Sequence, residues 1–392
     1  MKKLGLLVII NMFVFCFGAL AQSKELQVVN RILHSVDRKY APDKRTAIFS
    51  LQSVENSGQI VLKGRTNLPE AKRELLDSLS LQGIGYRDSI VVLPEASLGG
   101  KIWGLATISV ANMRTGPDHA AELASQILMG TPVKILAAVD GWLQVQTPDQ
   151  YIGWVDELGI ALKTEAEMAA WKQSKRFVFN KMTGYALSAP DKKASNISDL
   201  VLDDLFELVS EVKGYLQVRF PDGRTAFVKK GDCISYYEWT TRPVDLQSIL
   251  SVAKQLLGVP YLWGGTSSKA VDCSGYTKTS YYSQAIILAR DASQQVRYGE
   301  HPDFKDHKNL QSGDLLFFGR TPQRITHVGL YLDNEDYINA SGLVRVNSLN
   351  PSDPKFKRND PKSLVSASRI LNSLNTEGII QVKNHPWYNG LP

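Results

Sequence analysis

Cysteine is scarce in this sequence, which has three cysteines among 392 residues: Cys16, Cys233 and Cys273. Two downstream cysteines with no histidine at ligand spacing cannot close a tetrahedral zinc site, so we expect no metal and no cofactor. In an oxidising compartment Cys233 and Cys273 could form a disulfide. We interpret Cys233 instead as a small buried apolar residue, because pairing would consume Cys273, whose surroundings favour reactivity.

The apolar run over residues 4–17 is shorter than the roughly 20 residues needed to span a bilayer. It follows two lysines and precedes an Ala-Leu-Ala cleavage pattern, which is typical of a secretory signal peptide. We therefore predict a signal peptide over residues 1–21 and an exported protein of the periplasm or cell envelope, without a stable membrane anchor. Lipidation at Cys16 is disfavoured, because Phe15 stands where a lipoprotein signal has a small residue.

Charge of one sign is not concentrated anywhere in the chain. The formal net charge is +6, and the basic residues are scattered without an accompanying aromatic motif, so nucleic acid is not implied as a partner. With 43% hydrophobic and 21% charged residues, the composition is that of a globular protein. A length of 392 residues predicts two or more cores. Nothing in the sequence decides the oligomeric state.

The N-terminal region, residues 22–95, has the pattern of a small α/β unit. Apolar residues at helical spacing begin at Leu26, and two strand-like runs over residues 44–51 and 59–64 predict a hairpin. A second helix over residues 67–81 and a final strand complete the unit. No residue cluster in this region suggests chemistry.

The middle of the chain contains an internal repeat. Residues 141–145, Gly-Trp-Leu-Gln-Val, recur as residues 214–218, Gly-Tyr-Leu-Gln-Val, an offset of 73 (214 − 141). Short strands with Pro, Asp and Gly turns predict two copies of a small β-barrel. The copies resemble bacterial SH3-like domains, the first over residues 96–165 and the second over residues 172–240, with a linker helix beginning at Glu165.

Cys273 lies in the stretch around which the C-terminal third is organised. A Gly-rich loop leads to Asp272, a suitable N-cap, so Cys273 is expected in the first turn of a helix. There the helix dipole would favour the thiolate. His327 lies inside a predicted strand over residues 325–332, and Asn339 near the end of the next one. This order of Cys, His and Asn suits a nucleophile, a general base and the group that orients the base.

The chain resembles the NlpC/p60 cysteine peptidases. The resemblance rests on four ordered motifs: Tyr-Leu-Trp-Gly-Gly at 261–265, Asp-Cys-Ser-Gly at 272–275, Gly-Asp-Leu-Leu-Phe-Phe at 313–318 and Thr-His-Val-Gly at 326–329. It implies a multidomain α+β protein with a papain-like catalytic domain over residues 241–392, preceded by the α/β unit and the two SH3-like barrels. The third polar residue of the family is often His, and here it is Asn339, which can also accept the imidazole N–H.

The resemblance also implies a substrate. Family members with two SH3-like domains, of the YkfC type, are γ-D-glutamyl-L-diamino acid endopeptidases that cut peptidoglycan stem peptides with a free N-terminal L-Ala. By position, the substrate pocket is then expected to be lined by Tyr261, Trp263, Asp272, Ser274, Ser293, Tyr151 and Glu122. An acid and an exposed Tyr151 beside Asp272 would suit an ammonium group.

Two other functions stay open at this point: a cell-wall-binding protein without catalysis, and an amidase or acyltransferase on the same fold. The sequence does not distinguish diaminopimelate from lysine at the scissile bond. It also leaves open whether intact wall or released peptide is cut.

Overall fold

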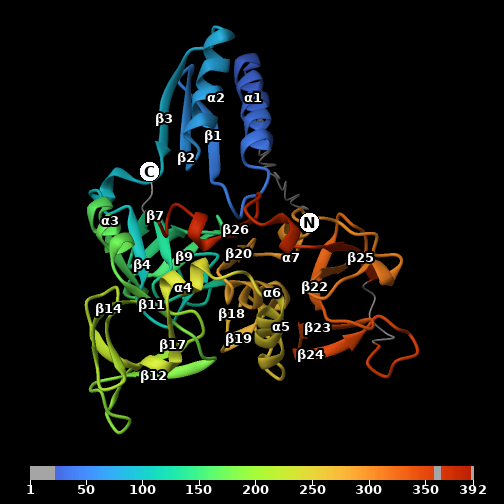
Figure 1. Ribbon diagram of the computed structural model, residues 1–392. Coiled ribbons are helices and arrows are strands. Elements are labelled where there is room, and N and C mark those ends of the chain that lie inside the picture. Colours follow the sequence, from blue (N-terminus) through green and yellow to red (C-terminus); the bar gives the residue numbers. More distant parts are fainter. Residues whose placement is uncertain (1–22, 357–362, 390–392) are drawn as a thin grey trace, which may run out of the picture. The chain divides into compact units, whose positions relative to one another are not determined.

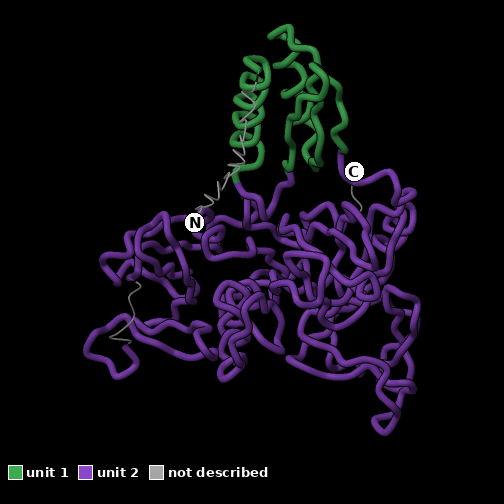
Figure 2. The backbone as a smooth tube through the Cα atoms, turned by 180° about the vertical axis from the view of Figure 1, so that it is seen from behind, with its two compact units in different colours: residues 1–42, 49–91 green, residues 43–48, 92–392 purple. Residues whose placement is uncertain are grey.

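The computed structural model describes residues 23–356 and 363–389, so the expected signal peptide at 1–21 lies outside the described residues. The chain divides into two compact units, one of residues up to 42 with 49–91 and one of residues 43–48 with 92–392 (Figure 2). Both mix helices and strands, which confirms the predicted α+β class. No helix within the described part of the chain is long and apolar enough to cross a membrane.

The smaller unit is a helix pair with a three-stranded sheet of order β1-β2-β3. Its elements are α1 (Lys24–Tyr40), β1 (Phe49–Asn56), β2 (Gln59–Thr66), α2 (Pro69–Leu81) and β3 (Tyr86–Val92). The apolar side chains of α1 are buried at the predicted helical spacing from Leu26 onward. The first strand begins at Phe49 and not at residue 44 as predicted, because residues 43–48 belong to the larger unit.

Two seven-stranded sheets follow, and they have the same topology. The first has the order β10-β4-β7-β8-β9-β5-β6, and the second has the order β13-β12-β16-β15-β14-β11-β17. Adding seven to each strand number of the first gives the second in reverse. The first is formed by β4 (Trp103–Ala106), β5 (Val110–Arg114), β6 (Leu123–Leu128), β7 (Pro132–Val139), β8 (Trp142–Gln146), β9 (Ile152–Asp156) and β10 (Ile160–Lys163). The second is formed by β11 (Arg176–Phe179), β12 (Thr183–Leu187), β13 (Asn196–Val201), β14 (Leu205–Val212), β15 (Tyr215–Arg219), β16 (Thr225–Lys229) and β17 (Cys233–Ser235).

The sequence repeat is also visible in the irregularities of the two sheets. The register between β7 and β8 shifts after Ile135, and that between β14 and β15 shifts after Leu208. The offset of 73 (208 − 135) is the offset of the sequence repeat. Helix α3 (Glu165–Gln173) joins the sheets where the linker helix was predicted, and a capping box at Thr164 begins it.

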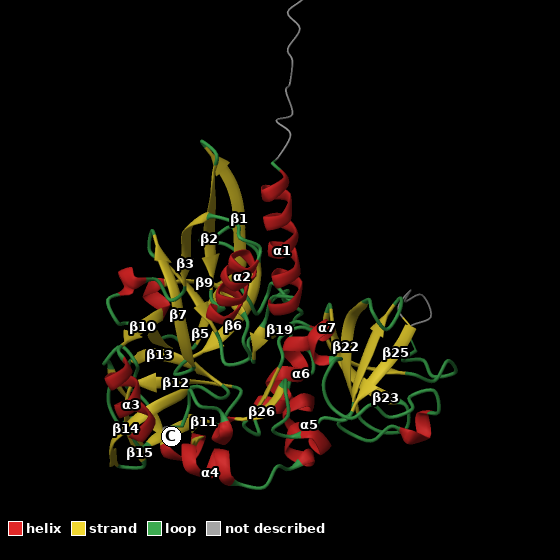
Figure 3. Ribbon diagram, turned by 90° about the horizontal axis from the view of Figure 1, so that it is seen from above, coloured by secondary structure: helices red, strands yellow, loops and turns green. Residues whose placement is uncertain are grey.

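The C-terminal part is built on a five-stranded antiparallel sheet of order β24-β23-β22-β21-β25. Its strands are β21 (Leu315–Gly319), β22 (Ile325–Tyr331), β23 (Asp336–Ser341), β24 (Leu343–Ser348) and β25 (Ser363–Ser368). Two short pairs, β18 (Thr266–Ser267) with β19 (Ala270–Val271) and β20 (Ile286–Leu288) with β26 (Ile379–Gln381), accompany it. The helices are α4 (Tyr236–Thr241), α5 (Leu246–Gln255), α6 (Cys273–Tyr282) and α7 (Ala292–Gln295). Figures 1 and 3 show α5 and α6 together on one side of this sheet.

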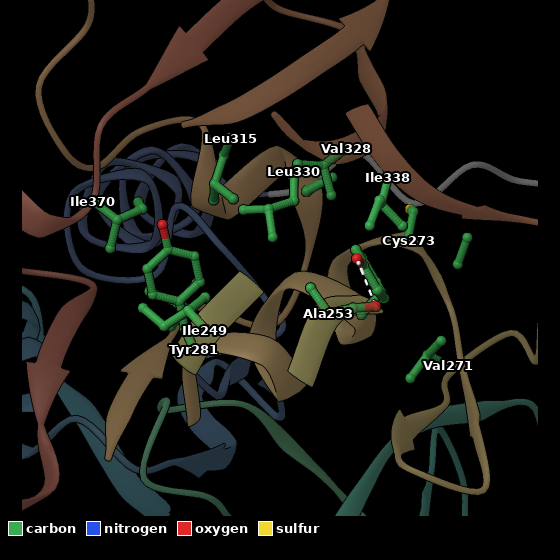
Figure 4. Packing of buried hydrophobic residues seen from close by; sticks show 14 of the residues in the cluster. Ile249, Ala253, Val271, Cys273, Tyr281, Leu315, Val328, Leu330, Ile338 and Ile370 are labelled. Atoms are coloured by element: carbon green, nitrogen blue, oxygen red, sulfur yellow. Dashed lines mark hydrogen bonds between the residues drawn. The ribbon is translucent and has the colours of Figure 1, made fainter. Parts of the chain in front are cut away.

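Helix α6 and the sheet share one apolar core. Cys273 and Tyr281 from the helix pack with Val328 of β22 and Ile338 of β23 (Figure 4). The helix ends at Tyr282, and Ile286 and Ile287 lie in strand β20.

Gly313 and Asp314, which directly precede β21, form hydrogen bonds that connect the elements around this core. Tyr281 Oη donates a hydrogen bond to the carbonyl oxygen of Gly313 at 2.5 Å. The buried Asp314 carboxylate accepts two hydrogen bonds from Arg369, at 3.0 and 2.9 Å. These two residues therefore tie the start of β21 both to α6 and to the chain beyond β25.

A small cavity of about 60 Å³ lies where α6 meets residues of the two seven-stranded sheets and their loops. It is lined by residues of all three parts, among them Ile127, Asp203 and Thr279. Asp203 Oδ2 and Thr279 Oγ1 are buried and have no hydrogen-bond partner among the described residues. Burial raises the pKa of Asp203 to about 8, and Arg242 opposes the shift.

We predict that Asp203→Asn removes a pH-dependent loss of stability. The folded-state pKa near 8 lies above the ordinary value of 3.8, so the folded protein keeps a proton that the unfolded chain releases. The free energy of unfolding of the wild type then falls as pH rises from about 4 to 8 and levels off above. Thermal unfolding should give a Tm difference between variant and wild type that is smallest near pH 4 and grows up to pH 8. A difference independent of pH would contradict this assignment.

Candidate active site

Cys273 is the first residue of α6, where the Gly-rich loop enters the helix. Asp272 is the N-cap, and its carboxylate accepts hydrogen bonds from the backbone N–H groups of Gly275 at 2.7 Å and Gly264 at 3.0 Å. Only glycine fits at position 275, because a Cβ there would lie 1.9 Å from the carbonyl oxygen of Gly265. The loop therefore lies directly against the first helical turn and fixes the position of Cys273.

A buried ion pair supports this helix start. Arg290 is 1% exposed and its Nη2 lies 2.6 Å from Asp272 Oδ2. It also donates from Nη1 to Ser274 Oγ at 3.1 Å and from Nε to Ser125 Oγ, in β6, at 3.0 Å. Asp272 was expected to line the substrate pocket, and its charge there is already compensated by Arg290. Asp272 and Ser274 both line the pocket, but their side-chain oxygens already form hydrogen bonds that stabilise the start of α6.

The environment of the Cys273 thiol differs from the expectation. Burial raises the pKa of the thiol to about 11, and the Asp272 carboxylate adds to the shift. Backbone hydrogen bonds from Val328 and Ser274 lower this pKa without reversing the effect of burial. Lost hydration therefore opposes the helix dipole and disfavours the thiolate in the substrate-free protein. A base has to take the proton during the reaction.

His327 in β22 is the candidate for that base. It is half-buried and adjoins Val328, whose backbone group contacts the Cys273 thiol. Its Nε2 lies 3.0 Å from Oδ1 of Asn339, a buried residue of the neighbouring strand β23. With Nε2 protonated and donating to Asn339, the other ring nitrogen, Nδ1, is left as the basic one.

The orientation of the Asn339 amide is set by a residue that the sequence did not reveal. Asn339 Nδ2 donates to Asn347 Oδ1 at 2.8 Å, and Asn347 Nδ2 donates to the carbonyl oxygen of Lys355 at 3.0 Å. A carbonyl oxygen can only accept, so it fixes the direction of both amides. Asn339 Oδ1 is thereby turned toward His327.

One pocket of about 520 Å³ brings the predicted residues together, a volume typical of ligand sites. Cys273 lines it with all seven residues predicted to bind substrate, Tyr261, Trp263, Asp272, Ser274, Ser293, Tyr151 and Glu122. Thr326 also lines it and precedes His327. Residues from the first seven-stranded sheet and from the C-terminal part thus share one cavity.

Glu122 and Trp263 form the contact between these two parts at the pocket. Trp263 Nε1 donates to Glu122 Oε1 at 2.6 Å. The loop carrying Trp263 approaches β6 so closely that a Cβ on Gly264 would lie 2.4 Å from the carbonyl oxygen of Leu123. Gly264 also has φ +81°, so the first Gly of the motif is required both by its conformation and by this approach.

Tyr151 reaches the pocket in a different way from the one predicted. The ring was expected to be exposed, but it is 8% exposed and packs in the core of the first seven-stranded sheet. Tyr151 lines the pocket, and its hydroxyl donates to Asp291 Oδ2 at 3.1 Å. Burial, and next the Asp291 carboxylate, raise the pKa of Tyr151, so the hydroxyl stays protonated. The turn before β9, in which Thr147 N–H binds the Tyr151 carbonyl, directs the ring inward.

Sequence reasoning missed four residues here: Arg45, Arg290, Asp291 and Asn347. Asp291 forms a capping box with Gln294 at the start of α7. The spacing of Asp291 and Gln294 in the sequence could therefore have predicted this helix start. Arg45 had none, because it is more than 200 residues distant in sequence from the partners it contacts, Asp291 and Ser293.

Comparison with known proteins identifies the class. The model of the NlpC/P60 family matches residues 258–360, and that of the bacterial dipeptidyl-peptidase Sh3 domain matches residues 113–160. A γ-D-glutamyl-L-lysine dipeptidyl-peptidase of Bacillus cereus is 28% identical over 265 residues, covering 64% of this chain and 78% of that protein. The murein DD-endopeptidase MepS/murein LD-carboxypeptidase of Escherichia coli K12 is 31% identical over 137 residues, covering 34% of this chain and 70% of that protein.

A solved structure has the same fold. The crystal structure of an NlpC/P60 family protein from Bacillus cereus aligns with a TM-score of 0.58 at 24% identity, covering 68% of this chain and 99% of that one. The fold is therefore that of an NlpC/P60 protein, and the family match and the relatives identify the chain as a cysteine peptidase. The chain belongs to the NlpC/P60 family, as the motifs predicted.

The first prediction for the site concerns the protonation of Cys273. Because the pKa of the thiol is raised to about 11, its alkylation by iodoacetamide should accelerate steadily from pH 6 to 9. Cys273→Ser supplies the background from Cys233, the other free cysteine among the described residues. A rate that is already constant below pH 8 would indicate a low-pKa thiolate and contradict the assignment.

The second prediction concerns Asn347, which orients the Asn339 amide. Asn347→Ala removes the acceptor that orients Asn339, and we expect kcat to fall on the order of 10-fold with KM little changed. Asn347→Asp keeps an acceptor oxygen and should retain more activity than the alanine variant. Steady-state kinetics on both variants, with Tm as the control for folding, checks this. Equal kcat in wild type and Asn347→Ala would show that this orientation has no role.

Proposed function

We propose that this enzyme is a cysteine endopeptidase that hydrolyses the γ-D-glutamyl–diamino acid bond of peptidoglycan stem peptides with a free N-terminal L-Ala. One observation carries the proposal: Glu122 and Tyr151, which directly precede strands β6 and β9 of the first seven-stranded sheet, line the pocket of Cys273. They form a wall at which a short peptide can end. A peptide still attached to glycan would need space where this wall lies.

In the proposed mechanism, the sulfur of Cys273 attacks the γ-carbonyl carbon while His327 takes the thiol proton. Asn339 holds the imidazole with Nδ1 toward the sulfur. The backbone N–H of Cys273 has no acceptor within its own helix and is available to the oxyanion. His327 then protonates the leaving amine, and water hydrolyses the thioester, which restores the thiol and releases the glutamyl carboxylate.

The charges of the pocket support a free ammonium as the group recognised. Of the carboxylates that line the pocket, Asp272 pairs with Arg290 and Asp291 pairs with Arg45. The Glu122 carboxylate has no cation within 4.0 Å among the described residues, and it accepts a hydrogen bond from the indole of Trp263. Glu122, beside the Tyr151 wall, is therefore the carboxylate left to pair with the N-terminal ammonium of the substrate.

The names of relatives support the bond and the compartment. The Bacillus cereus relative is named for γ-D-glutamyl-L-lysine and as a dipeptidyl-peptidase. The Escherichia coli relative is named as a murein hydrolase. With the expected leader at residues 1–21, this supports export to the periplasm or cell envelope, where stem peptides of the wall or peptides released from it are the substrate.

We predict that N-acetylation of the L-Ala in L-Ala-γ-D-Glu-diaminopimelate lowers kcat/KM by about 100-fold or more, equivalent to about 2.7 kcal/mol. The reason is that Glu122 would face a neutral amide in place of an ammonium. Glu122→Gln should reduce the ratio of kcat/KM between the free and the N-acetylated peptide. Glu157→Gln, a change of an exposed carboxylate in the same domain outside the pocket, should not.

Mass spectrometry of the products distinguishes the candidate functions. Endopeptidase cleavage yields L-Ala-D-Glu and the free diamino acid, and the lysine peptide and intact sacculi are tested in parallel. Cys273→Ala should give no product. Equal cleavage of free and acetylated peptides would refute the role of the wall, and binding of sacculi without any product would indicate a protein that only docks on the cell wall.

A further inference from the structure

The segment Asp43–Ile48, which precedes β1, forms part of the pocket wall. Ile152 N–H, at the start of β9, donates to the Arg45 carbonyl at 2.7 Å, and Gln146 Nε2 donates to the Thr46 carbonyl at 3.1 Å. Ile48 packs against the buried residues Leu93, Leu136 and Ala137. The segment is thus held on the first seven-stranded sheet next to Tyr151, and Arg45 lines the pocket of Cys273.

The guanidinium of Arg45 forms hydrogen bonds with three residues. Nε and Nη2 donate to the two oxygens of Asp43 at 2.8 and 2.7 Å. Nη1 donates to Asp291 Oδ2 at 2.7 Å and to Ser293 Oγ at 3.0 Å. Four of its five N–H bonds have partners among the described residues, and one on Nη2 remains. Ser293, which accepts from Arg45, keeps its hydroxyl proton to donate elsewhere.

Arg45 differs in accessibility from the other cation of the pocket. The Arg290 side chain is 1% exposed and is engaged with Asp272, Ser274 and Ser125, whereas the Arg45 side chain is 34% exposed. Among the described residues that line the pocket, Arg45 is therefore the one cation that can meet a charged group of a ligand.

The proposed substrate has such a group. In a γ-linked D-glutamyl residue the side-chain carboxyl forms the scissile bond, so the α-carboxylate remains free and negatively charged. Glu122 is suited to the ammonium of this peptide and repels its carboxylate. The carboxylate has to face a different part of the same pocket, and Arg45 with Ser293 supplies two donors there.

We propose that Arg45 is a specificity-determining residue that, together with the Ser293 hydroxyl, recognises the α-carboxylate of the D-glutamyl residue. This inference rests on the proposed function. Asp43 and Asp291 already surround the guanidinium, and their negative charges weaken its attraction for a third carboxylate. The expected discrimination between an α-carboxylate and a neutral α-carboxamide is therefore modest, about 10-fold in kcat/KM.

The test compares L-Ala-γ-D-Glu-diaminopimelate with L-Ala-γ-D-isoglutaminyl-diaminopimelate, in which the α-carboxylate is a carboxamide. Wild type should cut the carboxylate peptide about 10-fold more efficiently. Arg45→Gln should bring the ratio of the two kcat/KM values close to one, and Arg45→Lys should keep part of the preference. Arg297→Gln is the matched control, because Arg297 Nη1 lies 3.8 Å from the same Asp43 but outside the pocket lining. It should leave the ratio unchanged.

Two results would overturn the inference: equal cleavage of both peptides by wild type, or a loss in Arg45→Gln that is the same for both peptides. The second would mean that Arg45 only compensates the charge of Asp291. Neither result affects the proposed function, since both require cleavage at the γ-D-glutamyl bond. Failure of wild type to cut either peptide would refute the proposed function, and the inference with it.

Discussion

The buried ion pair between Asp272 and Arg290 is the interaction on which the site depends. Asp272 caps the helix that begins with Cys273, and Arg290 compensates its charge where both are removed from water. Removing one partner of such a pair costs about 3–5 kcal/mol, because the other is left as an uncompensated buried charge. The same guanidinium binds Ser125 of the first seven-stranded sheet. One side chain therefore holds both the nucleophile and the neighbouring domain.

A series of oppositely charged neighbours extends from this pair along the pocket. Arg290 Nη1 lies 3.9 Å from Asp291, Asp291 binds Arg45, and Arg45 binds Asp43. The residues come from three separate stretches of the chain and compensate one another. Glu122 stands outside this series. A pocket with one uncompensated carboxylate and one accessible guanidinium suits a short peptide with one free ammonium and one free carboxylate, which links the arrangement of domains to the choice of substrate.

Much of the site could be predicted because the information is local. Asp272, Cys273, His327 and Asn339 lie in short motifs whose spacing fixes a helix start and two adjacent strands. The repeat with offset 73 predicted two similar domains, and the strand orders and register shifts follow it. The pocket residues came from the family resemblance, and they do line one cavity.

The remaining features depend on packing between distant segments. Arg45 reaches the pocket because residues 43–48 lie on β9, and no pattern within those six residues indicates this. The Tyr151 ring points into the core because it lies in the turn before β9. The in–out alternation of side chains along a strand does not apply to a turn residue. The helix start was expected to favour the Cys273 thiolate, but burial of the thiol, and next the Asp272 carboxylate, raise its pKa. The orientation of the Asn339 amide depends on Asn347 and on a carbonyl of Lys355.

The central claim is that the peptide ends at a wall made by the first seven-stranded sheet. A crystal structure of Cys273→Ala with L-Ala-γ-D-Glu-diaminopimelate tests it most directly. We expect the ammonium within hydrogen-bond distance of Glu122 and the γ-carbonyl carbon beside residue 273. A peptide bound with its N-terminus directed away from Glu122 into solvent, with room for an attached glycan, would contradict the account.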